Sequence, residues 1–224
     1  MRSTVAFLAL ALLLAACSLG PTPTPAPACP TGAPGIEARA ILGDAERAVV
    51  VTSKGEFTIE LDPSSAPVAV ANFVALARCG FYDEVSFHRI IAGFVAQAGD
   101  PQTRDNHGDF EGLGTGGPGY RFEVEFPAED TTYVKYMVAM ANAVQYDQSG
   151  QIIGPTDSNG SQFFVMLDDV PGLPPYYSVL GRVTAGMDVV DAMGQVPTTQ
   201  TDVPLDPIVI EGIRIESGPV ESPA

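Results

Sequence analysis

One short stretch of this chain sets a single cation and a single amide among aliphatic and aromatic side chains. Residues 87–100 read as two apolar strands separated at Gly93, with Arg89 on the first strand and Gln97 on the second. Because side chains two residues apart in a strand share a face, Arg89 points the same way as Ile91. An unpaired buried charge is costly, so Arg89 is either paired inside the protein or lies at the floor of a half-solvated groove. We favour the groove.

The pattern of the remaining chain predicts a mainly β domain that could carry such a groove. Residues 49–52 and 57–61 are rich in β-branched residues and flank a polar turn, which is typical of a hairpin. A helix is predicted to begin at Pro67 and to stop at Gly80. The other predicted elements are strands at 120–125, 136–141, 162–166, 178–183 and 208–215 and a short helix at 187–193. Many short strands with two helices and no repeating βαβ unit indicate an antiparallel sandwich or barrel.

The composition argues against several classes of function. The chain has 224 residues, is 46% hydrophobic, contains no Trp and carries a formal net charge of −16. Nucleic-acid binding concentrates Lys and Arg on one face, so we expect no nucleic-acid partner. His88 and His107 are far apart, and no cysteine has metal-binding spacing. We interpret the acidic residues at 105–111 as solvated and expect neither a metal nor another cofactor.

The N-terminus has the build of a secretory signal. Arg2 precedes an apolar run over residues 5–16, which is too short to span a bilayer as a mature helix. The run ends in Leu-Ala-Ala-Cys at residues 14–17, which resembles the lipobox of bacterial lipoproteins. We therefore expect residues 1–17 to be a signal peptide and Cys17 to be lipidated, which would anchor the protein to a bacterial membrane outside the cytoplasm. The alternative is an ordinary signal with a chance cysteine.

Residues 18–44 are predicted to be a spacer between this anchor and the folded domain. Their first half alternates Pro, Thr and Ala, which favours extended polyproline II and cannot bury a core. With Cys17 lipidated, Cys29 and Cys79 remain in an oxidising compartment. A Cys29–Cys79 disulfide and two unrelated free cysteines both remain open.

Several blocks of sequence, in this order, resemble the cyclophilin family of peptidyl-prolyl cis-trans isomerases. They are residues 87–100, Gly114-Thr115-Gly116-Gly117, Met140-Ala141-Asn142-Ala143 and Asn159-Gly160-Ser161-Gln162-Phe163-Phe164. Residues 177–183 and 186–190 resemble the last barrel strand and helix of that family. The resemblance covers residues 45–216 and leaves 217–224 as a tail. It implies a closed eight-stranded antiparallel barrel capped by two α-helices.

The resemblance also implies which residues form a substrate groove. Arg89, Gln97 and Phe94 would be catalytic, with Arg89 donating to the prolyl nitrogen. Around the substrate, the proline pocket would be lined by Phe94, Val95, Phe164 and Leu173, the substrate backbone would be held by Gln97, Gln162, Ala141 and Asn142, and the rim would be closed by Tyr177. The alternative interpretation of these aromatic and amide side chains is ordinary core packing.

Rotation of an X–Pro bond suits such a groove because no bond is made or broken. The barrier of about 18–20 kcal/mol comes from the loss of amide resonance, so no nucleophile, metal or cofactor is needed. In the twisted state the prolyl nitrogen regains a lone pair. A nearby guanidinium therefore interacts better with the transition state than with the ground state.

The sequence departs from the family pattern near the groove. Ala92 replaces a usual Pro, Val95 a usual Met, and Tyr177 a usual His, and the absence of Trp predicts weak sensitivity to cyclosporin. Residues 102–113 and 144–158 are longer than the pattern suggests. They either shape substrate choice or are surface insertions of no consequence, and we favour the second interpretation.

We therefore expect an extracytoplasmic, lipid-anchored monomer that isomerises X–Pro bonds of exported proteins and assists their folding. Its partners would be proline-containing polypeptides and the membrane. The alternative is a non-catalytic proline-peptide-binding or holdase chaperone module that uses the same groove. Arg89 favours catalysis, since a binder gains little from a charge aimed at the prolyl nitrogen. A small-ligand-binding barrel would need a hollow interior, which the large apolar residues argue against.

Overall fold

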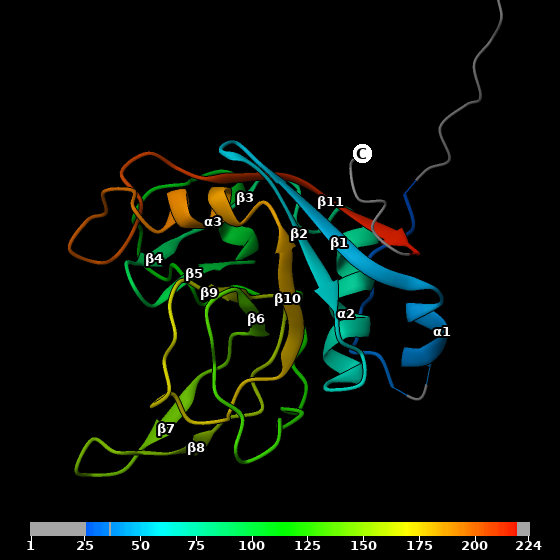
Figure 1. Cartoon of the computed structure of the whole chain (residues 1–224), viewed down its shortest axis with the longest axis horizontal. Helices are drawn as coiled ribbons and strands as arrows, with labels where there is room; N and C mark the ends of the chain where they lie inside the picture. Colours follow the sequence, from blue (N-terminus) through cyan, green and yellow to red (C-terminus); the bar gives the residue numbers. More distant parts are fainter. Residues whose placement is uncertain (1–25, 36, 219–224) are drawn as a thin grey trace, which may run out of the picture.

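The computed structural model describes residues 26–35 and 37–218, apart from the side chains of residues 146 and 152 (Figure 1). The predicted signal peptide, the lipobox Cys17 and most of the predicted tail lie outside the described residues. In chain order the elements are α1 (Ala38–Leu42), β1 (Ala45–Thr52), β2 (Gly55–Leu61), α2 (Pro67–Arg78), β3 (Val85–Ser86), β4 (Arg89–Ile91), β5 (Val95–Ala98), the 3₁₀ helix η1 (Pro101–Arg104), β6 (Met137–Met140), β7 (Val144–Tyr146), β8 (Ile152–Pro155), β9 (Phe163–Met166), β10 (Val179–Ala185), α3 (Met187–Met193) and β11 (Val209–Ser217).

Nine of these strands form one curled antiparallel sheet in the order β3-β11-β1-β2-β10-β6-β9-β5-β4. The prediction of a closed eight-stranded barrel is corrected by the structure. The sheet is open, with β3 and β4 at its two edges. Because β3 ends at Ser86 and β4 begins at Arg89, the two edges of the sheet must lie close together, and the sheet is therefore curled. The backbone N–H of Ile90 in β4 donates to the carbonyl of Asp202 at 2.8 Å instead of to β3. A loop between α3 and β11 thus occupies the edge that closure would require.

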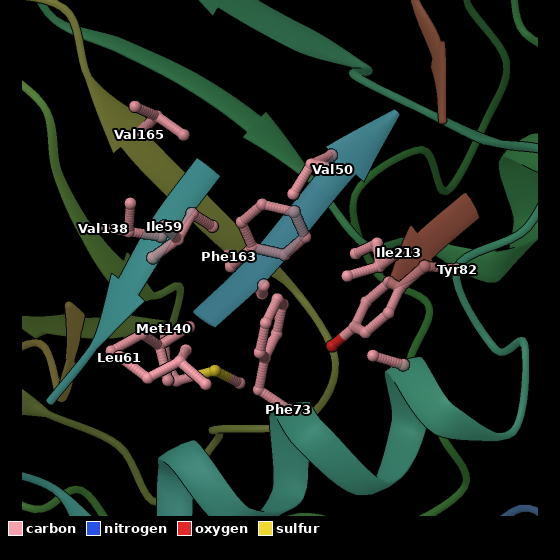
Figure 2. Close-up of a cluster of buried hydrophobic side chains, with 14 of the residues drawn as sticks. Val50, Ile59, Leu61, Phe73, Tyr82, Val138, Met140, Phe163, Val165 and Ile213 are labelled. Atoms are coloured by element: carbon pink, nitrogen blue, oxygen red, sulfur yellow. The ribbon is translucent and has the colours of Figure 1, made fainter. Parts of the chain in front are cut away.

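The core lies between one face of this sheet and helix α2 (Figure 2). Alternate residues along the strands point into it: Ile59 and Leu61 of β2, Val138 and Met140 of β6, and Phe163 and Val165 of β9. From α2, Phe73 packs its ring against Phe163 and Tyr82, with centroids 5.4 and 5.3 Å apart. Since strand side chains alternate, the residues between these core positions face the opposite side of the sheet.

Helix α2 begins at Pro67, as the sequence predicts, but its N-terminus is capped from far along the chain. Ala66 offers no side-chain cap. Instead, the carboxylate of Glu125 accepts the backbone N–H groups of Val68 and Ala69 at 3.1 and 2.8 Å. A carboxylate at this end satisfies otherwise unpaired donors and complements the helix dipole.

Most of the expected elements are confirmed. The hairpin is β1–β2, with Thr52 opposite Gly55, and both predicted helices are present as α2 and α3. The strand predicted at 120–125 is wrong, because this segment makes only an isolated bridge, between Phe122 and Asn159. Its residues serve other contacts, including the Glu125 cap. The pair β7–β8, in the longer segment at 144–158, and the short helix α1 were not predicted.

The N-terminal part of the described chain is fastened to α2. Cys29 and Cys79 form a disulfide, which decides between the two alternatives that the sequence left open. Helix α1 lies within the segment expected to be a spacer, and its Ala38 and Leu42 are buried in the core cluster. Within residues 26–35 and 37–218, no helix combines the length and apolar character that a membrane crossing requires.

Candidate active site

The strand register brings the predicted polar and apolar site residues into one row. Arg89 of β4 lies opposite Gln97 of β5, Gln97 lies opposite Phe164 of β9, and Phe164 lies opposite Ala139 of β6. Residues directly opposite one another across strands share a face. Their sequence neighbours, such as Ile90 and Phe163, point into the core, so the row lies on the other face of the sheet.

An apolar cluster beside this row contains every residue predicted to line the proline pocket. Val95 and Phe164 are buried in it, and Phe94, Leu173 and Tyr177 pack against it partly exposed. The Phe164 and Tyr177 rings meet edge to face, with centroids 5.3 Å apart. An apolar cluster that remains partly open to solvent, outside the main core, can receive a ring such as that of proline.

Tyr133 also belongs to this cluster, although the sequence analysis did not single it out. It is fully buried, its hydroxyl donates to the carbonyl of Tyr177 at 2.8 Å, and it accepts the N–H of Tyr177 at 3.0 Å. Burial raises the pKa of the Tyr133 hydroxyl to about 12, so it stays protonated and can make both bonds. A lone aromatic residue in an irregular segment gives no local signal of this contact.

Two amides form the polar floor of the site. The Nε2 of Gln97 donates to the Oε1 of Gln162 at 2.9 Å. The Nε2 of Gln162 in turn donates to the carbonyls of Gly114 and Gly116, at 2.8 and 2.9 Å. Because two acceptors face the Gln162 nitrogen, its oxygen must face Gln97, so the network orients both amides.

The buried carboxylate of Asp100, which was not among the predicted site residues, holds residues 114–117 in place. We call this segment the glycine loop. Asp100 is fully buried and accepts the backbone N–H groups of Gln102, Gly114 and Gly116, at 2.9, 2.7 and 3.2 Å. A Cβ on Gly116 would lie 2.0 Å from Asp100, so only glycine allows this close approach. The signal available in the sequence was the place of Asp100 at the end of the stretch 87–100, directly after Gly99 and before the glycine-rich block at 112–117.

His88, which precedes Arg89, is buried at 3% exposure. Burial lowers the pKa of its imidazole, and nearby Asp100 opposes that effect. Burial therefore favours the neutral form of the His88 ring, which lies just before β4.

A groove of about 670 Å³ opens next to the two amides. Of the predicted backbone-holding residues, Gln97, Gln162, Ala141 and Asn142 all line it. The Asn142 side chain donates to the carbonyl of Tyr176 at 2.7 Å, which ties this wall to the segment that carries Tyr177. Ala141 both lines the groove and packs against the apolar cluster, so the two adjoin there.

Arg89 is partly exposed and ion-paired, and it is not among the residues that line the groove described above. Its Nε lies 3.6 Å from the Oδ2 of Asp202, and the two side chains are 39% and 40% exposed. The Arg89 guanidinium thus keeps contact with solvent while its strand position places it next to Gln97 in the row.

The fold and site define a mainly β protein whose sheet carries an apolar cluster, two oriented amides and the partly exposed Arg89. The family model described as "Cyclophilin type peptidyl-prolyl cis-trans isomerase/CLD" matches residues 47–215. The chain is 38% identical to "Peptidyl-prolyl cis-trans isomerase B" of Streptomyces anulatus, over 76% of this chain and 96% of that protein. It is 37% identical to "Peptidyl-prolyl cis-trans isomerase A" of Mycobacterium tuberculosis, over 75% and 91%.

A crystal structure of a Cryptosporidium parvum cyclophilin type peptidyl-prolyl cis-trans isomerase aligns with a TM-score of 0.65 and 30% identity. The alignment covers 78% of this chain and 99% of that one. A second structure of that protein was determined in the presence of the dipeptide Ala-Pro. The chain belongs to the cyclophilin family and is a peptidyl-prolyl cis-trans isomerase.

Proposed function

We propose that this isomerase acts on X–Pro bonds of exported proteins and that Arg89 donates to the prolyl nitrogen in the transition state. The observation that carries the proposal is the row across β4, β5 and β9, in which Arg89, Gln97 and Phe164 are consecutive cross-strand neighbours. It sets a guanidinium beside an apolar pocket without burying it.

The proposed substrate position follows from the chemistry of the two surfaces. The proline ring enters the apolar cluster between Phe94, Val95, Phe164, Leu173 and Tyr177. The flanking backbone runs along the groove, where the oriented amides of Gln97 and Gln162 offer fixed polar groups. Arg89 then faces the imide nitrogen, whose lone pair is localised only when the bond is twisted. The interaction is therefore strongest in the transition state, which lowers the barrier.

The test is the rate of Ala-Pro isomerisation in a short peptide, measured by exchange NMR with the wild type and with Arg89→Ala. Loss of one well-placed donor should reduce the rate by about a hundredfold or more. Arg39→Ala is the matched control, since Arg39 is an exposed arginine on α1 and its loss should leave the rate unchanged.

An Arg89→Ala variant that keeps the wild-type rate would remove Arg89 from the mechanism. The alternative function, a non-catalytic peptide-binding or holdase module, would require a wild type that binds the peptide without accelerating its exchange.

The exported, lipid-anchored location through Cys17 and the monomeric state are further parts of the proposal. The folded domain expected at residues 45–216 also includes α1, whose Ala38 and Leu42 are buried in the core cluster. The Cys29–Cys79 disulfide supports export, because disulfides persist in oxidising compartments. The lipobox-like sequence at residues 14–17 supports lipidation.

A further inference from the structure

The loop between α3 and β11, residues 197–206, reaches the catalytic edge of the sheet. We call it the Asp202 loop. We propose that Asp202 is a positioning residue that holds the Arg89 guanidinium in its working orientation, and that residues 102–113 brace this loop. The inference rests on the role proposed above for Arg89.

The carboxylate of Asp202 approaches Arg89 from the Nε side of the guanidinium, with Nε and Oδ2 3.6 Å apart. A guanidinium is a planar fork with five N–H donors, so an anion beside Nε leaves the two terminal nitrogens to face a substrate. An arginine side chain without a partner samples many rotamers. The ion pair restricts that sampling before the substrate arrives, which is the condition for electrostatic preorganisation.

The backbone of Asp202 is fixed against the strand that carries Arg89. Its carbonyl accepts the N–H of Ile90, the next residue after Arg89, at 2.8 Å. Its own φ is 66°, in the left-handed region, which Asp and Asn tolerate better than other non-glycine residues. The carboxylate is thus presented from a backbone that is registered to β4.

Hydrogen bonds within the Asp202 loop keep that backbone in place. The Oγ1 of Thr199 accepts the N–H groups of Thr201 and Val203, each at 3.2 Å. The N–H of Thr199 donates to the carbonyl of Val203 at 2.8 Å, and the N–H of Asp202 donates to the carbonyl of Thr199 at 3.2 Å. The turn that carries Asp202 is closed on both sides of it.

The segment at 102–113 contacts this turn from outside. Thr201 directly precedes Asp202, and its Oγ1 donates to the Oδ2 of Asp109 at 2.5 Å. Asp109 lies in one of the two segments that are longer than the family pattern. The contact therefore gives that segment a role at the catalytic edge, in place of the inert surface insertion favoured from sequence.

Asp202→Asn is the decisive substitution, because Asn keeps the size and the left-handed backbone but removes the charge. An exposed ion pair is worth little, so kcat for the Ala-Pro peptide should fall by about two- to fivefold. KM should stay unchanged, since orientation of Arg89 matters in the transition state. Asp109→Asn should give a smaller fall in the same direction.

The matched control is Asp206→Asn. Asp206 lies in the same loop but pairs with Lys54, not with Arg89, so its loss should leave kcat at the wild-type value.

Two further readouts separate positioning from a merely structural role. In an Arg89→Ala background, Asp202→Asn should cause no additional loss, because Asp202 acts only through Arg89. Raising the ionic strength from about 0.01 M to 1 M should lower the wild-type kcat toward the Asp202→Asn value, since the Debye length falls from about 30 Å to 3 Å. The kcat of Asp202→Asn should not respond to salt.

Each outcome decides the inference. A kcat for Asp202→Asn that equals or exceeds that of the wild type, while Arg89→Ala has collapsed, overturns this inference alone. An additional loss in the Arg89→Ala background also overturns it, because Asp202 would then act on the fold. Full activity of Arg89→Ala would overturn the proposed role of Arg89 and this inference with it.

Discussion

Asp100 illustrates how a residue that touches no substrate can shape the groove. Its buried carboxylate gathers three backbone N–H groups, two of them from the glycine loop. The carbonyls of the same two glycines then orient the amide of Gln162. Asp100 therefore positions the Gln162 amide indirectly, through the backbone of Gly114 and Gly116.

Asp100→Asn should therefore loosen the floor of the groove. The Asn nitrogen cannot accept a hydrogen bond and would face at least one backbone N–H, and a lost charge-assisted bond costs about 1.5–3 kcal/mol. We expect a KM for the Ala-Pro peptide about tenfold higher, with a smaller change in kcat, in the exchange NMR assay.

Asp105→Asn is the control for Asp100→Asn, since Asp105 is exposed and lies close in sequence. An unchanged KM in Asp100→Asn would show that the glycine loop keeps its shape without the carboxylate.

At the scale of elements, α2 depends on a contact that its own sequence does not contain. The helix packs Phe73 into the core and carries Asn72, whose Nδ2 donates to the carbonyl of Gly160 at 2.7 Å. The N–H groups at its start are paired with Glu125. The helix thus reaches the segment just before Gln162 and is itself held by the segment beyond the glycine loop.

Glu125→Ala should lower the free energy of unfolding by about 1–2 kcal/mol, the usual value of an N-terminal cap with a favourable charge. Urea denaturation should show a lower midpoint with an unchanged m-value. Glu123→Ala, at an exposed neighbour, should change the free energy by no more than about 0.5 kcal/mol. Equal effects of the two substitutions would contradict a capping role.

At the scale of the whole molecule, the N-terminal segment that the disulfide fastens and the sheet edge that carries Arg89 lie apart. In Figure 1 the described N-terminal residues and α1 run beside α2, whereas β4, β5 and the β7–β8 hairpin lie on the other side of the domain. The Cys29–Cys79 disulfide holds this arrangement where the chain meets α2. A tether attached at the N-terminus would therefore leave the groove open to polypeptides.

The proposed anchor predicts that the full-length chain expressed in a bacterial host incorporates radiolabelled palmitate and sediments with membranes. Cys17→Ser should abolish the label, because the lipidated thiol is lost. Cys29→Ser is the control and should still be labelled. A wild type that carries no label would show that residues 14–17 do not act as a lipobox.

The sequence alone placed Arg89 and Gln97 on neighbouring strands among apolar residues, and the resemblance to the cyclophilin family predicted that Phe164 joins them. The run at residues 163–166 is apolar and buried throughout, so a period of two gives no signal there of which face Phe164 occupies. The helices at Pro67 and Met187 and the hairpin β1–β2 were likewise available from local signals. The residues expected to line the pocket do gather in one cluster.

Only the tertiary structure decided the contacts between segments that are distant in the chain. Three of these contacts join segments far apart in the sequence: the Glu125 cap on α2, the Tyr133–Tyr177 hydrogen bonds and the pairing of Asp202 with Arg89. The open edge of the sheet likewise became visible only in the structure. A residue pattern records which side of an element is apolar, but it does not record which polar groups will meet once the apolar faces have packed. These contacts depend on how the sheet curls and where each loop crosses it, and here they set the surroundings of Arg89.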